Sequence, residues 1–208
     1  MSKIIAGLDE SGRGPLAGPV VGAIVAIQSS KIKKVALKFP EIKDSKKLTS
    51  KKRDELFKKI KRLKKDIIWK TAAVYPKTID KINILQATLL SWKRCIKKLE
   101  KFNKCKLDLI YIDGNISIPN LNIPQITQIK GDENNFLISL ASIIAKVIRD
   151  KIMKRLNQKY PQYKLSKHKG YATKLHLRLI KEYGPAKIHR KSFKPIKNFN
   201  FKSYPQQT

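Results

Sequence analysis

The chain has 208 residues, of which 47 are Lys or Arg and 15 are Asp or Glu, giving a formal net charge of +32. This length suits one domain, or one domain with a small appendage, and can bury a substantial core. No apolar run reaches membrane-spanning length and no signal-peptide pattern precedes the first strand, so we expect a soluble, cytoplasmic protein. Cys95 and Cys105 show no metal-binding spacing and are expected to be reduced thiols.

The excess of basic residues predicts a polyanionic partner, because clustered Lys and Arg displace counterions from a phosphate backbone. Lys outnumbers Arg, and Ile and Asn are abundant, so part of the charge reflects general composition. The basic run at residues 58–65 is interpreted as a solvated helix face. Basic residues that fall inside motifs are therefore better candidates for binding than the total charge suggests.

Strand patterns and helix patterns alternate along the chain, which predicts an α/β fold. Strands are expected at residues 3–9, 20–27, 67–74 and 107–113. A Gly/Pro-rich turn joins the first strand to the second.

Helices are expected at residues 49–65, from Thr78 onward, from residue 136 to about residue 157, and at residues 173–183. Thr78 and Thr173 are predicted N-caps, and Gly184 with Pro185 ends the last helix. The helix after Thr78 carries a core-facing apolar stripe formed by Ile82, Leu85, Leu89, Trp92, Ile96 and Leu99. Residues 194–208 are expected to form a flexible tail.

Two of the scarce acids, Asp9 and Glu10, stand side by side at the end of the first strand. Neighbouring carboxylates beside a buried strand repel each other and lose hydration, so a compensating cation or a raised pKa is expected. Consecutive strand residues point to opposite faces, so the two acids can share one ion only if the backbone turns sharply after Asp9. Gly12 and Gly14 make such a turn possible.

Two further acids have similar placements. Asp113 ends the strand expected at residues 107–113, and Asp132 precedes the long apolar helix that begins near residue 136. Mg²⁺ and Mn²⁺ prefer oxygen ligands and take only a few carboxylates from a protein. The sequence therefore predicts a divalent metal site formed by Asp9, Glu10, Asp113 and Asp132.

Other interpretations of the Gly-rich turn are less consistent with its neighbours. Residues 12–17 fit the loose dinucleotide-binding pattern G-x-G-x-x-A, but a strand-like segment follows where that motif needs a helix. A P-loop is excluded because no Gly-Lys-Ser/Thr follows at the required spacing. The plain alternative is a hairpin turn without a ligand.

The histidines also show no recognised metal-binding spacing. His168, His176 and His189 form neither an H-E-x-x-H motif nor a paired Cys/His pattern, which argues against zinc. His176 is interpreted as a packing or surface residue. His168 lies in a basic segment beside Tyr171, which suits either a backbone-binding loop with a stacking platform or a basic surface loop with the tyrosine packed inward.

Four motifs, in order, resemble the bacterial ribonuclease HII family. They are DESGRGPLAGPV at residues 9–20, DSKKL at 44–48, KGD at 130–132 running into ASIIAKVIRD at 141–150, and HKGY at 168–171. The resemblance spans roughly residues 3–193. Ser11 stands where the family more often has Ala or Val, and the Asn-rich stretch at residues 115–122 departs in length and composition.

The resemblance implies a ribonuclease H-like fold, with a central mixed sheet flanked by helices and a small helical C-terminal appendage. It implies a catalytic domain at residues 1–160 and a substrate-binding segment at 161–193. The implied activity is hydrolysis of the RNA strand of RNA/DNA hybrids, and cleavage 5′ of ribonucleotides in duplex DNA to give 3′-hydroxyl and 5′-phosphate ends. The four acids would hold Mg²⁺ or Mn²⁺ and carry the chemistry, and the enzyme is expected to act as a monomer.

Contacts to the substrate are expected at all four of these motifs. The turn of Gly12, Arg13 and Gly14 is suited to approach the ribose, because glycines let main-chain groups come close to a sugar. The resemblance also implies that Tyr171 contacts the nucleotide. Phosphate contacts are expected from Lys46, Lys146, Arg149 and Lys169.

Two functions of other classes remain open from the sequence. A non-catalytic basic nucleic-acid-binding protein would explain the charge but not the acids at strand ends. A different nuclease on the same fold, such as a junction resolvase, would use clustered carboxylates and metal but would not need the HKGY segment. Activity on a duplex with one embedded ribonucleotide separates the three.

Overall fold

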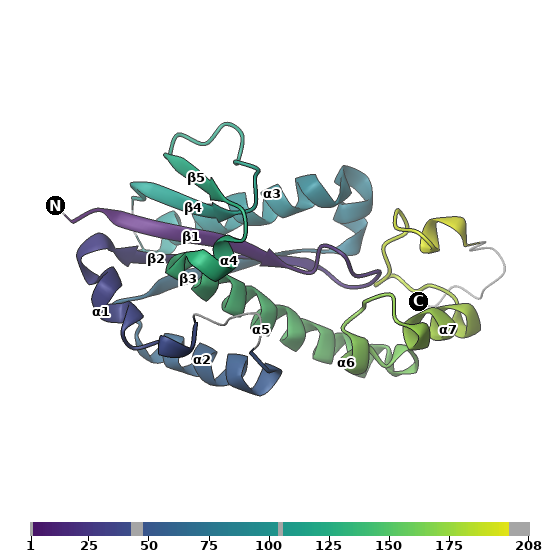
Figure 1. Cartoon of the computed structure of the whole chain (residues 1–208). Coiled ribbons are helices and arrows are strands. Elements are labelled where there is room, and N and C mark those ends of the chain that lie inside the picture. The colour runs from purple at the N-terminus through teal and green to yellow at the C-terminus, as the bar shows by residue number, and fades with distance from the viewer. Residues whose placement is uncertain (1, 43–47, 104–105, 200–208) are drawn as a thin grey trace.

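A five-stranded mixed sheet forms the centre of the molecule in the computed structural model, which describes residues 2–42, 48–103 and 106–199 (Figure 1). The strand order is β3-β2-β1-β4-β5. The antiparallel pairs are β1 with β2 and β2 with β3, and the parallel pairs are β1 with β4 and β4 with β5. The strands are β1 (Ile4–Ser11), β2 (Val20–Gln28), β3 (Ile68–Val74), β4 (Leu109–Asp113) and β5 (Gln125–Gln128).

Helices cover both faces of this sheet. The helix α5 (Phe136–Lys159) packs on one face together with α2 (Ser50–Arg62), and α3 (Pro76–Asn103) packs on the other. The shorter helices are α1 (Ile32–Ala36), α4 (Gly131–Asn134), α6 (Leu165–His168) and α7 (Lys174–Tyr183). Single 3-10 turns are η1 (Ser29–Lys31), η3 (Pro161–Tyr163) and η4 (Ile196–Asn198). The predicted mixed α/β fold is confirmed.

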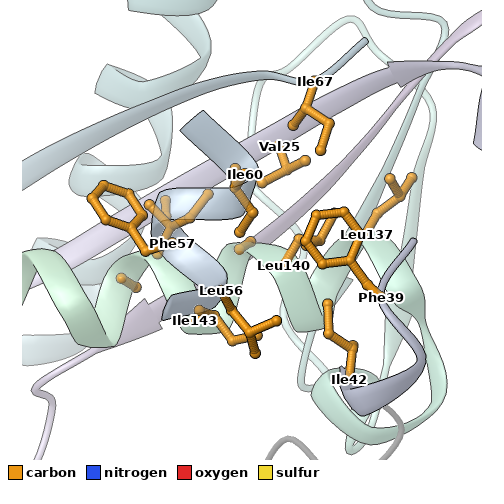
Figure 2. Close-up of a cluster of buried hydrophobic side chains, with 14 of the residues drawn as sticks. Val25, Phe39, Ile42, Leu56, Phe57, Ile60, Ile67, Leu137, Leu140 and Ile143 are labelled. Atoms are coloured by element: carbon orange, nitrogen blue, oxygen red, sulfur yellow. The ribbon is translucent and has the colours of Figure 1, made fainter. Parts of the chain in front are cut away.

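The strand β2 supplies side chains to both hydrophobic layers because successive residues point to opposite faces. Ala23, Val25 and Ile27 face the layer under α5 and α2, whereas Ile24 and Ala26 face the layer under α3. Figure 2 shows the first layer, in which side chains of α2, α5 and the segment after α1 meet over Val25. In the described residues no helix is long and apolar enough to cross a bilayer.

Gly7 fixes how closely α5 approaches β1. A Cβ atom at this position would lie 2.3 Å from the backbone carbon of Leu137. No side chain could fit there without moving the helix. The glycine therefore lets the first two turns of α5 pack directly against the strand that leads to Asp9.

The helix starts predicted near residue 49, at residue 136 and at Thr173 are confirmed, and the one at Thr78 is wrong. The hydroxyl oxygens of Thr49 and Thr173 cap α2 and α7, accepting from the N–H groups of Lys52 and His176. By contrast, α3 begins at Pro76, and Thr78 is its third residue rather than its cap. The helix is interrupted at Asn83, whose φ is 64° and whose side chain accepts from the Gln86 N–H, so Asn83 caps the second part.

The flexible tail expected from residue 194 is wrong for residues 194–199. This segment contains η4, and the side chain of Ile196 is fully buried against Leu16 and Ile180. Burial of one aliphatic side chain stabilises by about 1.5–3 kcal/mol, which offsets part of the entropy lost when this segment is ordered. The C-terminal helices lie at the end of the molecule where β1 runs out into its loop to β2 (Figure 1).

Candidate metal centre and substrate surface

Parallel pairing of β1 and β4 brings Asp9 close to the end of β4. Leu8 pairs with Ile112, and Asp9 and Asp113 are the next residue on each strand. The strand end expected at Asp9, with a sharp turn directly after it, is wrong, because β1 continues to Ser11 in antiparallel pairing with β2. Asp9 is 5% exposed, and one of its carboxylate oxygens accepts a 2.6 Å hydrogen bond from the N–H of Glu10. The two acids predicted from strand ends are thus neighbours in the fold.

Asp132 reaches the end of β4 from α4, which follows β5. The N–H of Asp132 donates to Asp113 Oδ1 at 3.4 Å, and the carbonyl of Asp132 accepts from Ser139 Oγ on α5 at 2.8 Å. Gly131 makes this close approach easier, because a Cβ there would lie 2.5 Å from Ile138 Cδ1 and 3.3 Å from Asp113 Oδ1. The fourth predicted acid therefore joins the group despite the irregular segment before it.

Burial and mutual repulsion raise the pKa values of three of these acids. For Asp9, burial raises the pKa well above its usual value, the Glu10 charge adds to this, and a hydrogen bond with Ser142 opposes it. Burial raises the pKa of Glu10 to about 7 against the attraction of Arg13, whose Nη1 lies 3.5 Å from Glu10 Oε1. The pKa of Asp113 is raised by burial and by the charge of Asp132. A cation would relieve this repulsion.

The chemistry of the donor set fits a divalent ion. All four acids offer carboxylate oxygens, the ligands that Mg²⁺ and Mn²⁺ prefer. As the side chains stand, no three His, Cys, Asp or Glu residues within the described ranges are grouped as ligands around one point. The coordination of a metal by Asp9, Glu10, Asp113 and Asp132 therefore stays a prediction.

The turn after β1 exposes its tip and buries its ends. Gly12 has φ of 95° and is buried, and a Cβ there would lie 2.0 Å from Arg149 Nε. Arg13 and Gly14 are exposed, and nothing lies within 4 Å of a Cβ placed on Gly14. The tip of the turn is open to solvent, and its contact with a substrate stays a prediction.

The HKGY segment lies beside this turn. The N–H of Leu16 donates to the carbonyl of Gly170 at 2.8 Å, which joins the two segments. Tyr171 is 49% exposed, so it is not packed inward. The Arg149 guanidinium lies 5.8 Å from the centre of its ring. Lys169 donates through Nζ to the Ser166 carbonyl at 2.5 Å, at the surface of the same loop.

All three histidines gather behind this loop, where sequence spacing gave no signal for a cluster. The N–H of Ala186 donates to His189 Nδ1, so the Nε2–H of His189 donates to His176 Nε2 at 3.2 Å. His176 then donates through Nδ1 to the Tyr171 carbonyl at 2.9 Å, and its ring stacks on His168 at 4.2 Å. Burial lowers the pKa of His176 to about 4 and that of His189 to about 3. Neutral histidines therefore fix the backbone at Tyr171.

The predicted phosphate contacts fall in different places. Lys146 lies on α5 with its Nζ 3.9 Å from Asp132 Oδ2 and 2.7 Å from Ser142 Oγ, at the edge of the acid group. Arg149 is 1% exposed and its guanidinium donates to backbone carbonyls, so its position favours a role inside the protein over contact with phosphate. Lys46 lies outside the described residues.

Sequence reasoning missed Arg190. Its side chain is fully buried and donates to the carbonyls of Gly12, Arg13 and Gly18. Basic residues surround it in the sequence, and nothing local distinguishes a buried arginine from a surface one. Its partners are more than 170 residues away along the chain.

Comparison with known proteins identifies the family and the fold. The family model for ribonuclease HII matches residues 6–196. A ribonuclease HII of Caldicellulosiruptor saccharolyticus is 49% identical over 191 residues, covering 92% of this chain and 87% of the relative. The crystal structure of ribonuclease H2 from Pyrococcus horikoshii OT3 superposes with a TM-score of 0.73 at 27% identity, covering 94% of this chain and 96% of that one. Bst-RNase HIII in complex with Mn²⁺, with a TM-score of 0.72 at 18% identity and coverage of 94% and 68%, shares the fold.

Proposed function

Since the chain belongs to the ribonuclease HII family, it is a metal-dependent nuclease acting on RNA/DNA hybrids and on ribonucleotides in DNA, and we propose which of its residues carry that activity. Asp9, Glu10, Asp113 and Asp132 are proposed to hold Mg²⁺ or Mn²⁺. The observation that carries this assignment is the parallel register of β1 and β4, which brings Asp9 and Asp113 close together. The raised pKa values of Asp9, Glu10 and Asp113 support it.

The protein's part in the reaction is to hold these carboxylates and the scissile phosphate in the right positions relative to each other. Divalent ions, when bound, supply a water of lowered pKa and positive charge at the leaving oxygen. The Glu10 N–H holds one Asp9 oxygen in place, and the Asp132 N–H does the same for Asp113. We propose cleavage on the 5′ side of the ribonucleotide, leaving 3′-hydroxyl and 5′-phosphate ends.

Lys146 and Lys169 are proposed to contact phosphates of the duplex. Lys146 stands beside Asp132 and keeps 34% of its side chain exposed, so it can reach a phosphate that lies against the acid group. Such contacts position a duplex without reading its sequence. We keep Lys46 in this role because of its position in the DSKKL motif alone. The buried position of Arg149 favours a role in holding the loops together rather than a contact with phosphate.

Ribose recognition is proposed for the exposed tip of the Gly12, Arg13 and Gly14 turn together with Tyr171. The 2′-hydroxyl is the group that distinguishes RNA from DNA, so selectivity requires hydrogen-bonding groups placed against it. The turn lies next to the HKGY segment through the Leu16 to Gly170 hydrogen bond, so both can contact one nucleotide. We also propose that the enzyme acts as a monomer in the cytoplasm, because every residue invoked comes from one chain and its substrates arise there.

The test is cleavage of a duplex with one embedded ribonucleotide, compared with the same duplex made only of DNA. Wild type should cut the first 5′ of the ribonucleotide in Mg²⁺ or Mn²⁺ and leave the second intact. Asp9→Asn should abolish the cut without weakening duplex binding, whereas Glu100→Gln, which removes an exposed carboxylate on α3, should cut normally. Binding without cleavage by wild type would favour a non-catalytic binding protein, and cleavage only of branched DNA would favour a junction resolvase.

A further inference from the structure

Two arginine side chains are buried beneath the turn of Gly12, Arg13 and Gly14, and neither has an ion-pair partner among the described residues. Arg149 on α5 is 1% exposed and Arg190 is 0% exposed. No carboxylate in the described part of the chain lies within ion-pair distance of either guanidinium. Burial lowers the pKa of both, that of Arg190 to about 9, which still leaves it charged near neutral pH. A buried charge persists only where polar groups take the place of water.

Backbone carbonyls of the loop between β1 and β2 provide that compensation. Arg190 donates to the carbonyls of Gly12 and Arg13 at 2.6 Å each and to that of Gly18 at 3.0 Å. Arg149 donates to the carbonyls of Pro19, Ala17 and Lys169, at 3.0, 3.2 and 3.0 Å. The loop is thus closed around two cations, with its carbonyl groups turned toward the interior.

The opposite side of these peptides faces away from the interior. In a trans peptide the C=O and the following N–H point in opposite directions. When Arg190 holds the Gly12 and Arg13 carbonyls inward, the N–H groups of Arg13 and Gly14 point outward. Both residues are exposed, and no acceptor for either N–H is found among the described residues.

We propose that Arg190 is a positioning residue for ribonucleotide recognition, which holds the Arg13 and Gly14 N–H groups outward as paired donors to the ribose 2′-hydroxyl oxygen. This inference rests on the proposed function and names a residue that acts through the turn without touching substrate. Arg149 adds the second constraint, because its bond to the Lys169 carbonyl ties the same loop to the segment that carries Tyr171.

The geometry requires arginine and not merely a positive charge. A guanidinium is a planar fork with five N–H donors, whereas a lysine ammonium is a single centre at the end of a flexible chain. One lysine Nζ cannot occupy both the Nη1 site at Arg13 and the Nη2 site at Gly12 and Gly18. Arg190→Lys therefore keeps the charge and loses the fork.

Asp80 on α3 holds the segment that carries Arg190. Its carboxylate accepts from the N–H of Lys191 at 3.0 Å, the N–H of Ser192 at 2.9 Å and the Ser192 hydroxyl at 2.6 Å. Asp80→Ala keeps the Arg190 side chain and removes the hydrogen bonds that hold the backbone next to it. It tests the same constraint from outside the buried site.

The experiment measures the ratio of dissociation constants for an all-DNA duplex and the same duplex with one ribonucleotide, by fluorescence anisotropy in EDTA. In wild type the ribonucleotide duplex should bind more tightly. Arg190→Lys should bring the ratio close to one, a loss of roughly 2- to 10-fold for one or two hydrogen bonds, with the all-DNA constant unchanged within about twofold. Arg178→Lys, an exposed arginine on α7, is the matched control and should keep the wild-type ratio.

A ratio of one in wild type, or a wild-type ratio in folded Arg190→Lys, overturns the inference. Circular dichroism establishes folding; if Arg190→Lys is unfolded, Asp80→Ala decides, with a fall in the ratio as support and an unchanged ratio as refutation. Failure of the proposed function is separate, because it would appear as absence of cleavage by wild type in Mg²⁺ and Mn²⁺.

Discussion

Replacing Glu10 by Gln should stabilise the metal-free protein at pH 8, although it removes a proposed metal ligand. The side chain of Glu10 is only 11% exposed, and burial raises its pKa from 4.5 to about 7. Above pH 7 the carboxylate is ionised in both the folded and the unfolded state, and the folded state bears the full free-energy cost of the buried charge. As the pH falls through 7 toward 4.5, the folded state takes up the proton first and the cost disappears.

The size of the effect follows from that shift. At 1.36 kcal/mol per pKa unit, the cost is about 3 kcal/mol at pH 8 and less than about 1 kcal/mol at pH 5. For a domain of this length about 3 kcal/mol corresponds to roughly 6–12 °C in melting temperature. The attraction of Arg13 is already included, because it contributes to the same pKa.

Urea unfolding followed by circular dichroism in EDTA, at pH 8 and pH 5, measures both values. Addition of Mg²⁺ at pH 8 should stabilise wild type and narrow its gap to Glu10→Gln, since the cation relieves the same repulsion. Glu100→Gln, which removes an exposed carboxylate, should leave the unfolding free energy unchanged. Equal stabilities of wild type and Glu10→Gln at pH 8, or a gap that does not shrink at pH 5, would refute the reasoning.

Asp113→Asn should abolish cleavage and leave duplex affinity unchanged or higher, because the chemistry depends on the ion and binding depends on the basic surface. Gel assays of cleavage and of duplex binding test this, and undiminished hydrolysis would contradict the metal assignment. Lys146→Ala should weaken binding to hybrid and plain duplex alike and flatten the salt dependence, measured by anisotropy titrations; selective loss of ribonucleotide discrimination would contradict a phosphate contact. Tyr171→Ala should cut cleavage severely, because loss of a stacking platform costs about 1–3 kcal/mol per base, while Tyr171→Phe isolates the hydroxyl; normal rates in a folded Tyr171→Ala protein would assign the ring to packing alone. Burial lowers the pKa of His176 from 6.5 to about 4, so the folded state favours the neutral ring. The free energy of unfolding is therefore highest above pH 6.5 and falls by up to about 3 kcal/mol as the pH falls toward 4. His176→Asn should therefore show a shallower fall in unfolding free energy between pH 6.5 and 4.5, and an unaltered slope would contradict a neutral buried ring.

Features with a local signal could be predicted from the sequence. Asp9 follows the apolar part of β1, Asp113 ends β4, and Thr49 and Thr173 stand directly before helices. Each of these assignments depends only on residues a few positions away, so the sequence alone is enough to predict it. Parallel pairing of β1 with β4 then brings the two acids together.

Features fixed by tertiary contacts could not be predicted in this way. The strand β5 is four residues long with Ile126 exposed, so it lacks a clear apolar alternation. Burial of Ile196 depends on Leu16 and Ile180, which lie far away in the sequence. The roles of His189 and Arg190 arise from hydrogen bonds to distant segments, and their own neighbours in the sequence are basic and polar.

The contact between Arg190 and the turn at Gly12 joins residues 178 positions apart, near the two ends of the chain. During synthesis the N-terminal turn and Arg149 emerge first, and the turn lacks the Arg190 guanidinium until residue 190 has left the ribosome. A product truncated before residue 190 would keep all four acids and lose this contact. On the proposed role of Arg190, we expect such a product to lose ribonucleotide selectivity.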